Sequence, residues 1–321
     1  MPSIARPSIL AQLFTASLAF GLLFPGSASA FSPPPPDACF ADDWAPPPPP
    51  PERVRGVAFV HGTSSQTQFT AHYEYWTDPM IQSVRQGLDD PFNYTVVACD
   101  FEQKFWHPGM ARCLADQLTD FLDSDVNDLV VYTHSHGGNA LRWILSNPTL
   151  DPSFVPIIED ISLTTIIAPS SLGTPLADLA ISGTGLTQWL GALLEFDNDA
   201  TAQQQTFAMH YFNQVYLLGT QGRPPLPISF WTLTGTDVTT KQPRCAEKKT
   251  VAGLHITHRL IKYKGDGCND GFLPCASQRG AGIPWADDVE VTYNGRELNH
   301  DVSRRDCFGL DVQLRNDLPL N

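Results

Sequence analysis

Runs of apolar residues recur along the chain and predict its β-strands. They cover residues 54–60, 92–100, 128–134, 161–169, 228–235 and 258–265, and each contains β-branched or aromatic side chains. A nearly continuous apolar run is typical of a strand that is buried on both faces, unlike an alternating pattern. Strands of this kind form parallel sheets, so we expect a mostly parallel central sheet.

Helical patterns lie between several of these runs. The segment 110–124 places Leu114 and Leu118 on one stripe at the helical period. The helical segment 137–147 follows the strand 128–134 directly. Strands that alternate with helices predict a doubly wound α/β domain, with helices on both faces of the sheet.

The segment 179–226 breaks this alternation, because two helical patterns follow each other without a strand between them. The leucines that share one face of the first pattern are Leu186, Leu190, Leu193 and Leu194. Two interpretations remain open. The segment is either a helix packed into the core or a mobile lid over an apolar pocket.

Residues 1–30 have the pattern of a secretory signal peptide. Arg6 is followed by an apolar stretch, and the segment closes on the small residues Ala28-Ser29-Ala30. The apolar stretch is interrupted by polar residues and glycine, and it is shorter than the roughly 20 apolar residues that a spanning helix needs. We therefore expect an exported, extracellular protein without stable membrane insertion.

Residues 31–52 are rich in proline, which makes a stiff and extended chain that cannot pack a core. We interpret this segment as a linker. The folded domain is then expected to cover residues 53–321, a length that suits one large α/β domain.

The net charge of the chain limits which kinds of partner or substrate it can bind. The chain carries 34 acidic and 20 basic side chains, for a net charge of −14, and it has no basic cluster. Such a surface repels nucleic acid and anionic membranes, and it admits a neutral substrate more easily than an anionic one.

The seven cysteines of an exported chain predict disulfides. No CxxC pair is present, so a zinc site is not expected. Cys99 and Cys113 are placed to tie a strand end to the next helix. Four more cysteines crowd the last quarter, namely Cys245, Cys268, Cys275 and Cys307. Cys39 in the linker is left as the odd cysteine.

Ser135 lies between the strand 128–134 and the following helix, in the sequence THSHGG. This is the layout of a nucleophile elbow, G-x-S-x-G, in which a sharp turn projects the serine oxygen. Gly137 satisfies the second glycine, whereas Thr133 replaces the first. The backbone N–H of His136 then begins the helix, where negative charge is favoured. A metal site is the weaker interpretation, because His134 and His136 would diverge on the turn.

A serine nucleophile requires a base and an acid, which follow it in the order acid, then histidine, in this type of fold. Among the later histidines, His300 lies in the polar loop near the C-terminus where the base is expected. Asp270 lies in the loop after the predicted strand 258–265, with Asp266 as its rival. Gly62 allows a close backbone approach, so the N–H of Thr63 is expected as the second oxyanion donor.

Together these segments resemble the secreted bacterial lipases and esterases of the α/β-hydrolase superfamily, the Pseudomonas-type true lipases. The resemblance extends from Val57 to Asp301 and rests on VHGT, YEYW, THSHGGNALRW, IIAPSSLGTPLAD, FWTLTGTD, NDGFLPCAS and LNHD. It implies an α/β-hydrolase fold with a helical lid at 179–226. The implied triad is Ser135, Asp270 and His300, and the implied oxyanion donors are the backbones of Thr63 and His136.

The resemblance also bears on metal and disulfides. Some family members hold a structural calcium partly through an aspartate two residues after the histidine. Here Val302 occupies that position and Asp301 follows His300 directly, so calcium stays open and no cofactor is expected to be required. The family links the acid loop to an upstream cysteine, which implies Cys245–Cys275, and a Cys268–Cys275 bridge competes with it.

The function that these features predict is secreted carboxylic-ester hydrolysis through an acyl-enzyme on Ser135, by a triacylglycerol lipase or esterase. The expected substrate is an ester or lipid, with an oil–water interface as one site of action. Leucines on a mobile lid would favour long acyl chains. The alternatives are an acyltransferase or a polyester hydrolase with the same triad, and a non-catalytic binding protein of the same fold.

Overall fold

The computed structural model describes residues 52–63, 75–182, 198–238, 245 and 248–318. The chain divides into two units, Met1–Pro51 and Glu52–Asn321, and the described residues belong to the second. The predicted signal peptide therefore lies outside the described residues, as does nearly all of the predicted linker. Within the described part, none of the helices combines the length and apolar character that crossing a bilayer requires.

The centre of the second unit is a six-stranded sheet in which all neighbouring strands pair in parallel, in the order β2-β1-β3-β4-β5-β6. The strands are β1 (Arg55–Val60), β2 (Tyr94–Val96), β3 (Asp128–His134), β4 (Ile161–Ile167), β5 (Phe230–Thr234) and β6 (Ile283–Asp287). Every residue of the central strand β3 is buried. The predicted parallel α/β fold is thus confirmed.

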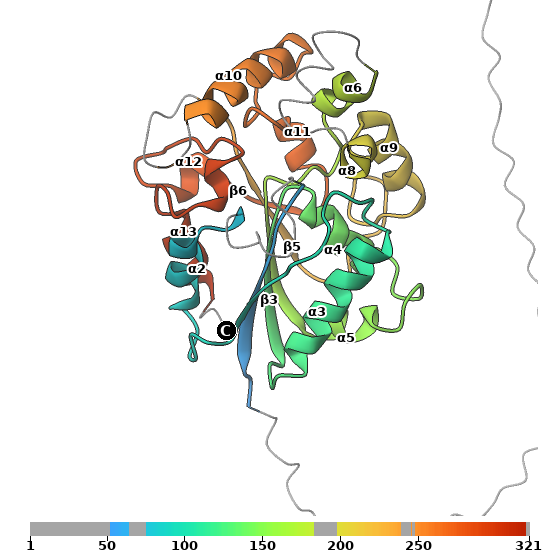
Figure 1. Cartoon of the computed structure of the whole chain (residues 1–321), viewed down its shortest axis with the longest axis vertical. Helices are drawn as coiled ribbons and strands as arrows, with labels where there is room; N and C mark the ends of the chain where they lie inside the picture. The colour runs from blue at the N-terminus through green and yellow to red at the C-terminus, as the bar shows by residue number, and fades with distance from the viewer. Residues whose placement is uncertain (1–51, 64–74, 183–197, 239–244, 246–247, 319–321) are drawn as a thin grey trace, which may run out of the picture. The chain divides into compact units, whose positions relative to one another are not determined.

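Helices cover both faces of this sheet. In Figure 1, α3 (Cys113–Leu122), α4 (Gly137–Ser146) and α5 (Phe154–Asp160) lie on one side, whereas α2 (Asp78–Arg85) and α13 (Leu310–Asp317) lie on the other. The remaining helices are the π-turn η3 (Pro108–Arg112), α6 (Pro175–Ser182), α8 (Asp199–Gln203), α9 (Thr206–Val215), α10 (Lys248–Tyr263), α11 (Cys275–Gln278), α12 (Asp288–Val291) and the 3-10 turn η4 (Val302–Arg304).

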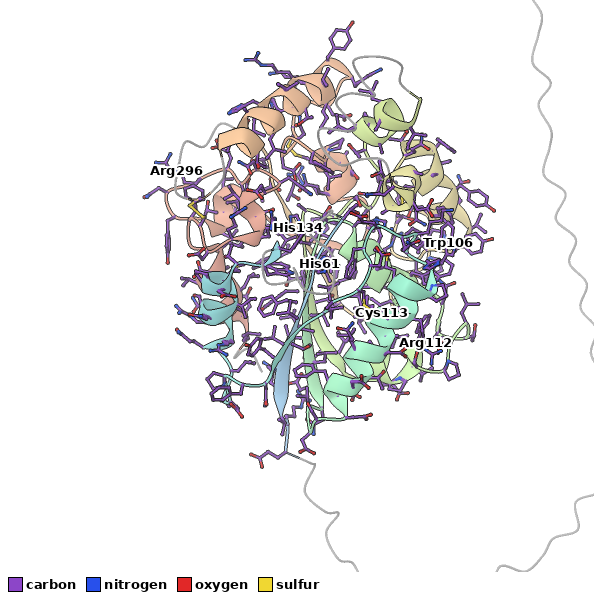
Figure 2. The ribbon with its side chains drawn as sticks, viewed as in Figure 1. His61, Trp106, Arg112, Cys113, His134 and Arg296 are labelled. Carbon is purple, nitrogen blue, oxygen red and sulfur yellow. A yellow bond between two sulfur atoms is a disulfide. The ribbon has the colours of Figure 1, made fainter. Side chains whose placement is uncertain are left out.

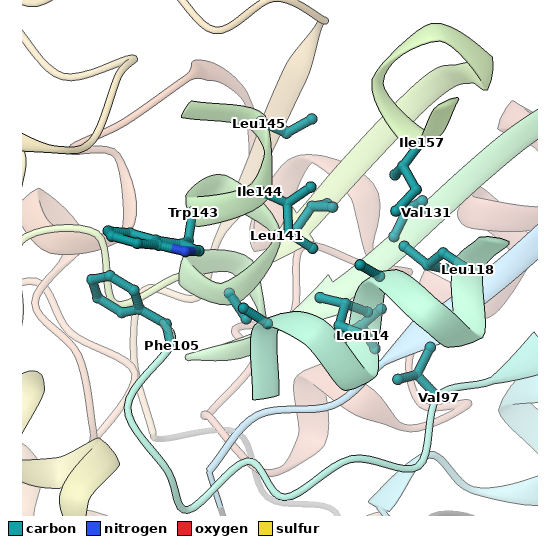
Figure 3. Close-up of a cluster of buried hydrophobic side chains, with 14 of the residues drawn as sticks. Val97, Phe105, Leu114, Leu118, Val131, Leu141, Trp143, Ile144, Leu145 and Ile157 are labelled. Atoms are coloured by element: carbon teal, nitrogen blue, oxygen red, sulfur yellow. The ribbon is translucent and has the colours of Figure 1, made fainter. Parts of the chain in front are cut away.

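The core is divided by the sheet into two clusters, because successive side chains of a strand point to opposite faces. Val131 of β3 belongs to the cluster under α3, α4 and α5, part of which is shown in Figure 3. Tyr132 belongs to the cluster under α2 and α13. The predicted stripe of Leu114 and Leu118 is fully buried in the first cluster. The buried stripe fixes α3 against the sheet and so supports the central strand β3, which ends just before Ser135.

One predicted strand is wrong. The run 258–265 does not form a strand, because residues 248–263 form helix α10. Its buried positions Leu254, Thr257 and Ile261 recur at spacings of three and four, which is the helical period. The last strand is instead β6, an edge strand whose five residues are all partly or fully exposed and which therefore has no apolar run.

The described part of the segment 179–226 contains the end of α6, then α8 and α9, and no strand. This agrees with the absence of a predicted strand. The four leucines of the expected lid lie outside the described residues, so the choice between a lid and a core helix stays a prediction.

Three disulfides link the described cysteines. Cys99–Cys113 forms as expected, and Figure 2 labels Cys113 at its helix. The implied pair Cys245–Cys275 is wrong, because Cys275 bonds to Cys268 across the acid loop, with Cα atoms 5.5 Å apart. Cys245 bonds to Cys307 instead. These bonds fit an extracellular environment. Cys39 lies outside the described residues.

Candidate active site

Ser135 occupies a strained turn at the end of β3. Its φ is 54°, in the left-handed region of the backbone, which residues other than glycine adopt at a cost of roughly 1–2 kcal/mol. Two glycines permit the turn. A Cβ on Gly137 would lie 2.3 Å from the carbonyl oxygen of His61, and one on Gly138 would lie 2.4 Å from Ile166. The elbow therefore requires residues without side chains at both positions.

Thr133, which departs from the glycine of the elbow motif, is accommodated within the regular strand. It pairs in register with Val60 of β1 and Ile166 of β4. The Thr133 hydroxyl fits because Gly138 has no side chain. A Cβ on Gly138 would lie only 3.2 Å from Thr133 Oγ1. The backbone strain of the elbow thus falls on Ser135 and not on Thr133.

The structure brings Ser135, His300 and Asp270 into one line of hydrogen bonds. His300 Nε2 lies 3.0 Å from Ser135 Oγ, and His300 Nδ1 lies 2.7 Å from Asp270 Oδ2. These contacts span 165 and 30 residues of sequence. A carboxylate only accepts hydrogen bonds, so it places the proton on Nδ1 and leaves Nε2 free to accept the serine hydroxyl.

Asp270 is held rigidly in the loop before α11. It is fully buried, and its Oδ1 accepts hydrogen bonds from the backbone N–H groups of Phe272 (2.9 Å) and Leu273 (2.7 Å). The Phe272 ring stacks on the His300 ring at 4.5 Å with an interplanar angle of 7°. The rival Asp266 does not reach His300, and its carbonyl accepts a hydrogen bond from Asn269.

The other histidines after Ser135 are far less suited to act as its base. His210 is exposed on α9, and His255 is exposed on α10. His258, also on α10, lies 4.0 Å from Asp237. Among the described histidines that lie beyond the elbow, namely His210, His255, His258 and His300, only His300 is hydrogen-bonded to Ser135.

The two predicted oxyanion donors flank Ser135. His136 follows Ser135 directly and precedes α4, so its N–H points out of a helix N-terminus. Gly62 packs against the elbow, since a Cβ on it would lie 2.7 Å from Ser135 Cβ, and Thr63 comes next. Thr63 Oγ1 accepts a hydrogen bond from Gln204 Nε2 at 3.2 Å. Gln204 lies 141 residues away, and nothing in the sequence indicates this contact.

The His136 side chain does not compete with His300. Burial lowers the pKa of His136 to about 3, so the ring is neutral at any physiological pH. Among the described residues, neither ring nitrogen has a hydrogen-bond partner. His134, the second histidine of the elbow, bonds to Tyr75 and Ser303 instead. The two rings therefore share no ligand, which argues against a metal site on the turn.

Asp301, the residue that raised the question of calcium, is bonded to two arginines. Its Oδ1 accepts from Arg304 Nη2 at 2.5 Å and from Arg305 Nη2 at 3.1 Å. Burial alone would raise the pKa of Asp301, but the two guanidinium groups outweigh it and lower that pKa. A carboxylate already neutralised in this way does not fit a cation site. The described residues also contain no cluster of three or more His, Cys, Asp or Glu that could hold a metal.

Asp288 joins the loops that carry the site, and sequence reasoning missed it. It is fully buried and accepts hydrogen bonds from Thr236 N (2.9 Å), Thr236 Oγ1 (2.7 Å) and Leu298 N (2.5 Å). Thr236 follows β5, and Leu298 lies two residues before His300. Asp288 therefore fixes the histidine loop to the end of the sheet. In the sequence, an acidic pair at 287–288 gives no sign of burial.

Replacing Asp288 by asparagine is expected to change how stability depends on pH. Burial raises the pKa of Asp288 to about 6, although its hydrogen bonds oppose this. Between its unfolded pKa of about 3.9 and pH 6, the folded protein binds the proton more strongly, so stability falls as pH rises through this window. The contribution is on the order of 3 kcal/mol.

The measurement is urea unfolding of the wild type and Asp288→Asn at pH 4, 5 and 6.5. The difference in unfolding free energy, wild type minus variant, should decrease as pH rises, because asparagine does not titrate. Parallel curves for the two proteins would contradict the assignment.

Comparison with known proteins places this geometry in a shared fold. No protein-family model and no curated protein matches the chain. The lipase BlEst2 of Bacillus licheniformis in its mature form aligns with a TM-score of 0.59 and 18% identity, over 84% of this chain and 94% of that chain. Lipase 1 of Pelosinus fermentans (0.52, 13%, over 84% and 100%) and EstA of Clostridium botulinum (0.51, 14%, over 83% and 88%) are also similar. At these identities the likeness concerns the fold, and the protein therefore has the α/β-hydrolase fold of these bacterial lipases and esterases.

Proposed function

We propose that the protein is a secreted serine carboxylic-ester hydrolase, a lipase or esterase, that acts through an acyl-enzyme on Ser135. The observation that carries this proposal is the line of hydrogen bonds from Ser135 Oγ through His300 to the buried Asp270. The strained turn at Ser135 supports it, because backbone strain of this kind is typical of a nucleophile elbow.

The proposed reaction begins when Ser135 Oγ attacks the ester carbonyl and His300 Nε2 takes the hydroxyl proton. Asp270 stabilises the imidazolium that forms. The backbone N–H groups of Thr63 and His136 donate hydrogen bonds to the negatively charged tetrahedral oxygen and so stabilise it. When this intermediate collapses, His300 protonates the departing alcohol and the acyl-enzyme remains. His300 then activates water, which releases the acid and regenerates Ser135.

The proposed substrate is a neutral ester or lipid, and no cofactor takes part. Neutral substrates suit a chain with a net charge of −14. Two of the structural neighbours named above, BlEst2 and lipase 1, are described as lipases, which supports the same substrate class. Disulfide bonding supports secretion. The Pseudomonas-type resemblance and the preferred acyl chain length stay predictions.

A fluorophosphonate probe tests the proposal directly, because it phosphonylates a serine only when a base activates that serine. We expect labelling of the folded protein and no labelling after heat denaturation. Digestion and mass spectrometry should place the added mass on the peptide that contains Ser135. A folded protein that stays unlabelled would instead favour a non-catalytic binding protein.

A further inference from the structure

A second set of hydrogen-bonded side chains lies next to Ser135, His300 and Asp270. It consists of Tyr75, His134 and Ser303, none of which touches the reacting atoms in the proposed mechanism. Figure 2 places His134 at the upper end of the sheet beside His61. His61 precedes Gly62 and Thr63, which we call the oxyanion segment. The set comes from three parts of the chain, since Tyr75 and Ser303 lie 59 and 169 residues from His134.

These groups form a continuous hydrogen-bond chain from the oxyanion segment to the base. The Gly62 backbone bonds to the Tyr75 hydroxyl, which lies 2.5 Å from His134 Nδ1. His134 Nε2 lies 2.9 Å from Ser303 Oγ. Ser303 Oγ donates to the backbone carbonyl of His300 at 3.0 Å. All of these side chains are buried.

The chemistry of each group fixes the direction of every bond. The His300 carbonyl only accepts, so the Ser303 hydroxyl proton is used there. Ser303 Oγ must then accept from His134, which places the His134 proton on Nε2. His134 Nδ1 is left as an acceptor for the Tyr75 hydroxyl, and the Tyr75 oxygen accepts from Gly62 N–H.

His134 remains neutral in this arrangement. Burial lowers its pKa well below 6.5, and the nearby charges of His300, Arg304 and His61 act in the same direction. Its ring centroid lies 4.6 Å from that of His300. His134 therefore cannot take the proton that His300 receives from Ser135. It keeps the same bonds while His300 changes charge during the proposed reaction.

Tyr75 is also held in place by Arg304, a residue of the loop that carries His300. The guanidinium carbon of Arg304 lies 4.5 Å from the centroid of the Tyr75 ring, and an Arg304 N–H donates to the Tyr75 carbonyl. Arg304 is paired with Asp301, the residue after His300. The segment that carries the base and the segment that carries Gly62 are thus tied through Tyr75 by two routes.

We propose that Tyr75, His134 and Ser303 are positioning residues that hold the base and the oxyanion segment in register around Ser135. This inference rests on the proposed function. Ser303 fixes the backbone of His300, and Tyr75 fixes the backbone of Gly62 next to Thr63. A shift of about 1 Å in a reacting group can lower a rate by roughly 100-fold, so such a link affects turnover without touching the substrate.

A double-mutant cycle in full-length protein tests the coupling. Tyr75→Phe removes one hydroxyl and Ser303→Ala removes the other, each without altering the triad. With a short, soluble p-nitrophenyl ester, we expect each variant to lower kcat by about tenfold or more while KM changes less than twofold. Because both act through His134, the double variant should fall by less than the product of the single effects.

Tyr132→Phe is the matched control. Tyr132 is also fully buried, and its hydroxyl also donates one hydrogen bond, to the Leu314 carbonyl at 2.8 Å, on the α13 side of the sheet. We expect Tyr132→Phe to lower the unfolding free energy as Tyr75→Phe does, but to keep the wild-type kcat. Ser303→Thr, which retains the hydroxyl, should restore most of the kcat lost in Ser303→Ala.

Three results would overturn the inference. One is a wild-type kcat in both Tyr75→Phe and Ser303→Ala. Another is an equal loss of kcat in Tyr132→Phe, which would reduce the effect to general destabilisation. The third is a double variant whose loss equals the product of the two single losses. If Tyr75→Phe does not fold, the pair Ser303→Ala and Ser303→Thr decides between the same outcomes.

A readout that needs no turnover separates this inference from the proposed function. In ¹⁵N-histidine NMR spectra, the His134 signal, assigned by its loss in His134→Phe, should show the Nε2–H tautomer. The His300 signals should shift in Tyr75→Phe. The Nδ1–H tautomer, or unshifted His300 signals, would overturn the positioning role even in an active protein. A wild type that neither hydrolyses esters nor binds the fluorophosphonate overturns the proposed function alone.

Discussion

Replacing Ser135 by alanine is expected to lower kcat for a p-nitrophenyl ester by roughly 10⁶-fold, the order seen when a serine nucleophile is deleted from a triad. The reason is that His300 and Asp270 then have no hydroxyl to activate. The three groups work as a unit, so a second substitution at His300 should add little further loss. The measurement is the initial rate at saturating ester, with circular dichroism to verify the fold.

A glycine at the same position separates activity from backbone strain. Ser135→Ala keeps a side chain at a φ of 54°, whereas glycine adopts this angle freely. Ser135→Gly should therefore be inactive as well, yet more stable than Ser135→Ala by roughly 1 kcal/mol in urea unfolding. Hydrolysis that survives in both variants would exclude Ser135 as the nucleophile. Equal stability of the two would show that the elbow is not strained.

Replacing Asp270 by asparagine is expected to lower kcat by roughly 10⁴-fold near neutral pH. Oδ1 of this residue accepts two backbone N–H groups, from Phe272 and Leu273. An asparagine must keep its oxygen on that side, so its NH₂ group faces His300. The ring must then accept at Nδ1 and carry its proton on Nε2, which prevents it from taking the Ser135 proton.

Asp266→Asn is the control for this substitution. Asp266 lies in the same loop and was the alternative candidate for the acid in the sequence, but it does not reach His300. Its replacement should leave kcat within about twofold, because losing a partly exposed charge alters little. The experiment compares kcat of both variants between pH 6 and 10. A large loss in Asp266→Asn together with a mild one in Asp270→Asn would reverse the assignment of the acid.

The predictions that held were those that depend on local pattern. The run 128–134 forms the buried strand β3, and the run 161–169 contains the largely buried strand β4 (Ile161–Ile167). Both are parallel strands, as a continuous apolar run predicts in an α/β protein. The strand predicted at 258–265 is wrong because a short apolar run does not distinguish a strand from a helix. Leu260 and Ile261 are neighbours in either structure, and only the buried positions further upstream show the helical period.

The disulfides show a different limit. Cys268 and Cys275 are separated by seven residues, and the acid loop returns the chain so that their Cα atoms lie 5.5 Å apart. Cys245 and Cys307 are separated by 62 residues and meet only because the fold brings them together. Sequence spacing cannot choose between such pairings, since loop closure depends only weakly on length.

By itself, the sequence determined the parallel α/β class, the turn after β3 and the chemical types of Ser135, Asp270 and His300. These properties reside in short segments whose side chains have few local alternatives. The tertiary structure alone decided which groups hold these three in place. Tyr75, His134 and Ser303, like Asp288 and Gln204, act across separations of 10 to 169 residues. Hydrogen bonds of that range depend on where distant backbones meet, and no local pattern encodes that meeting.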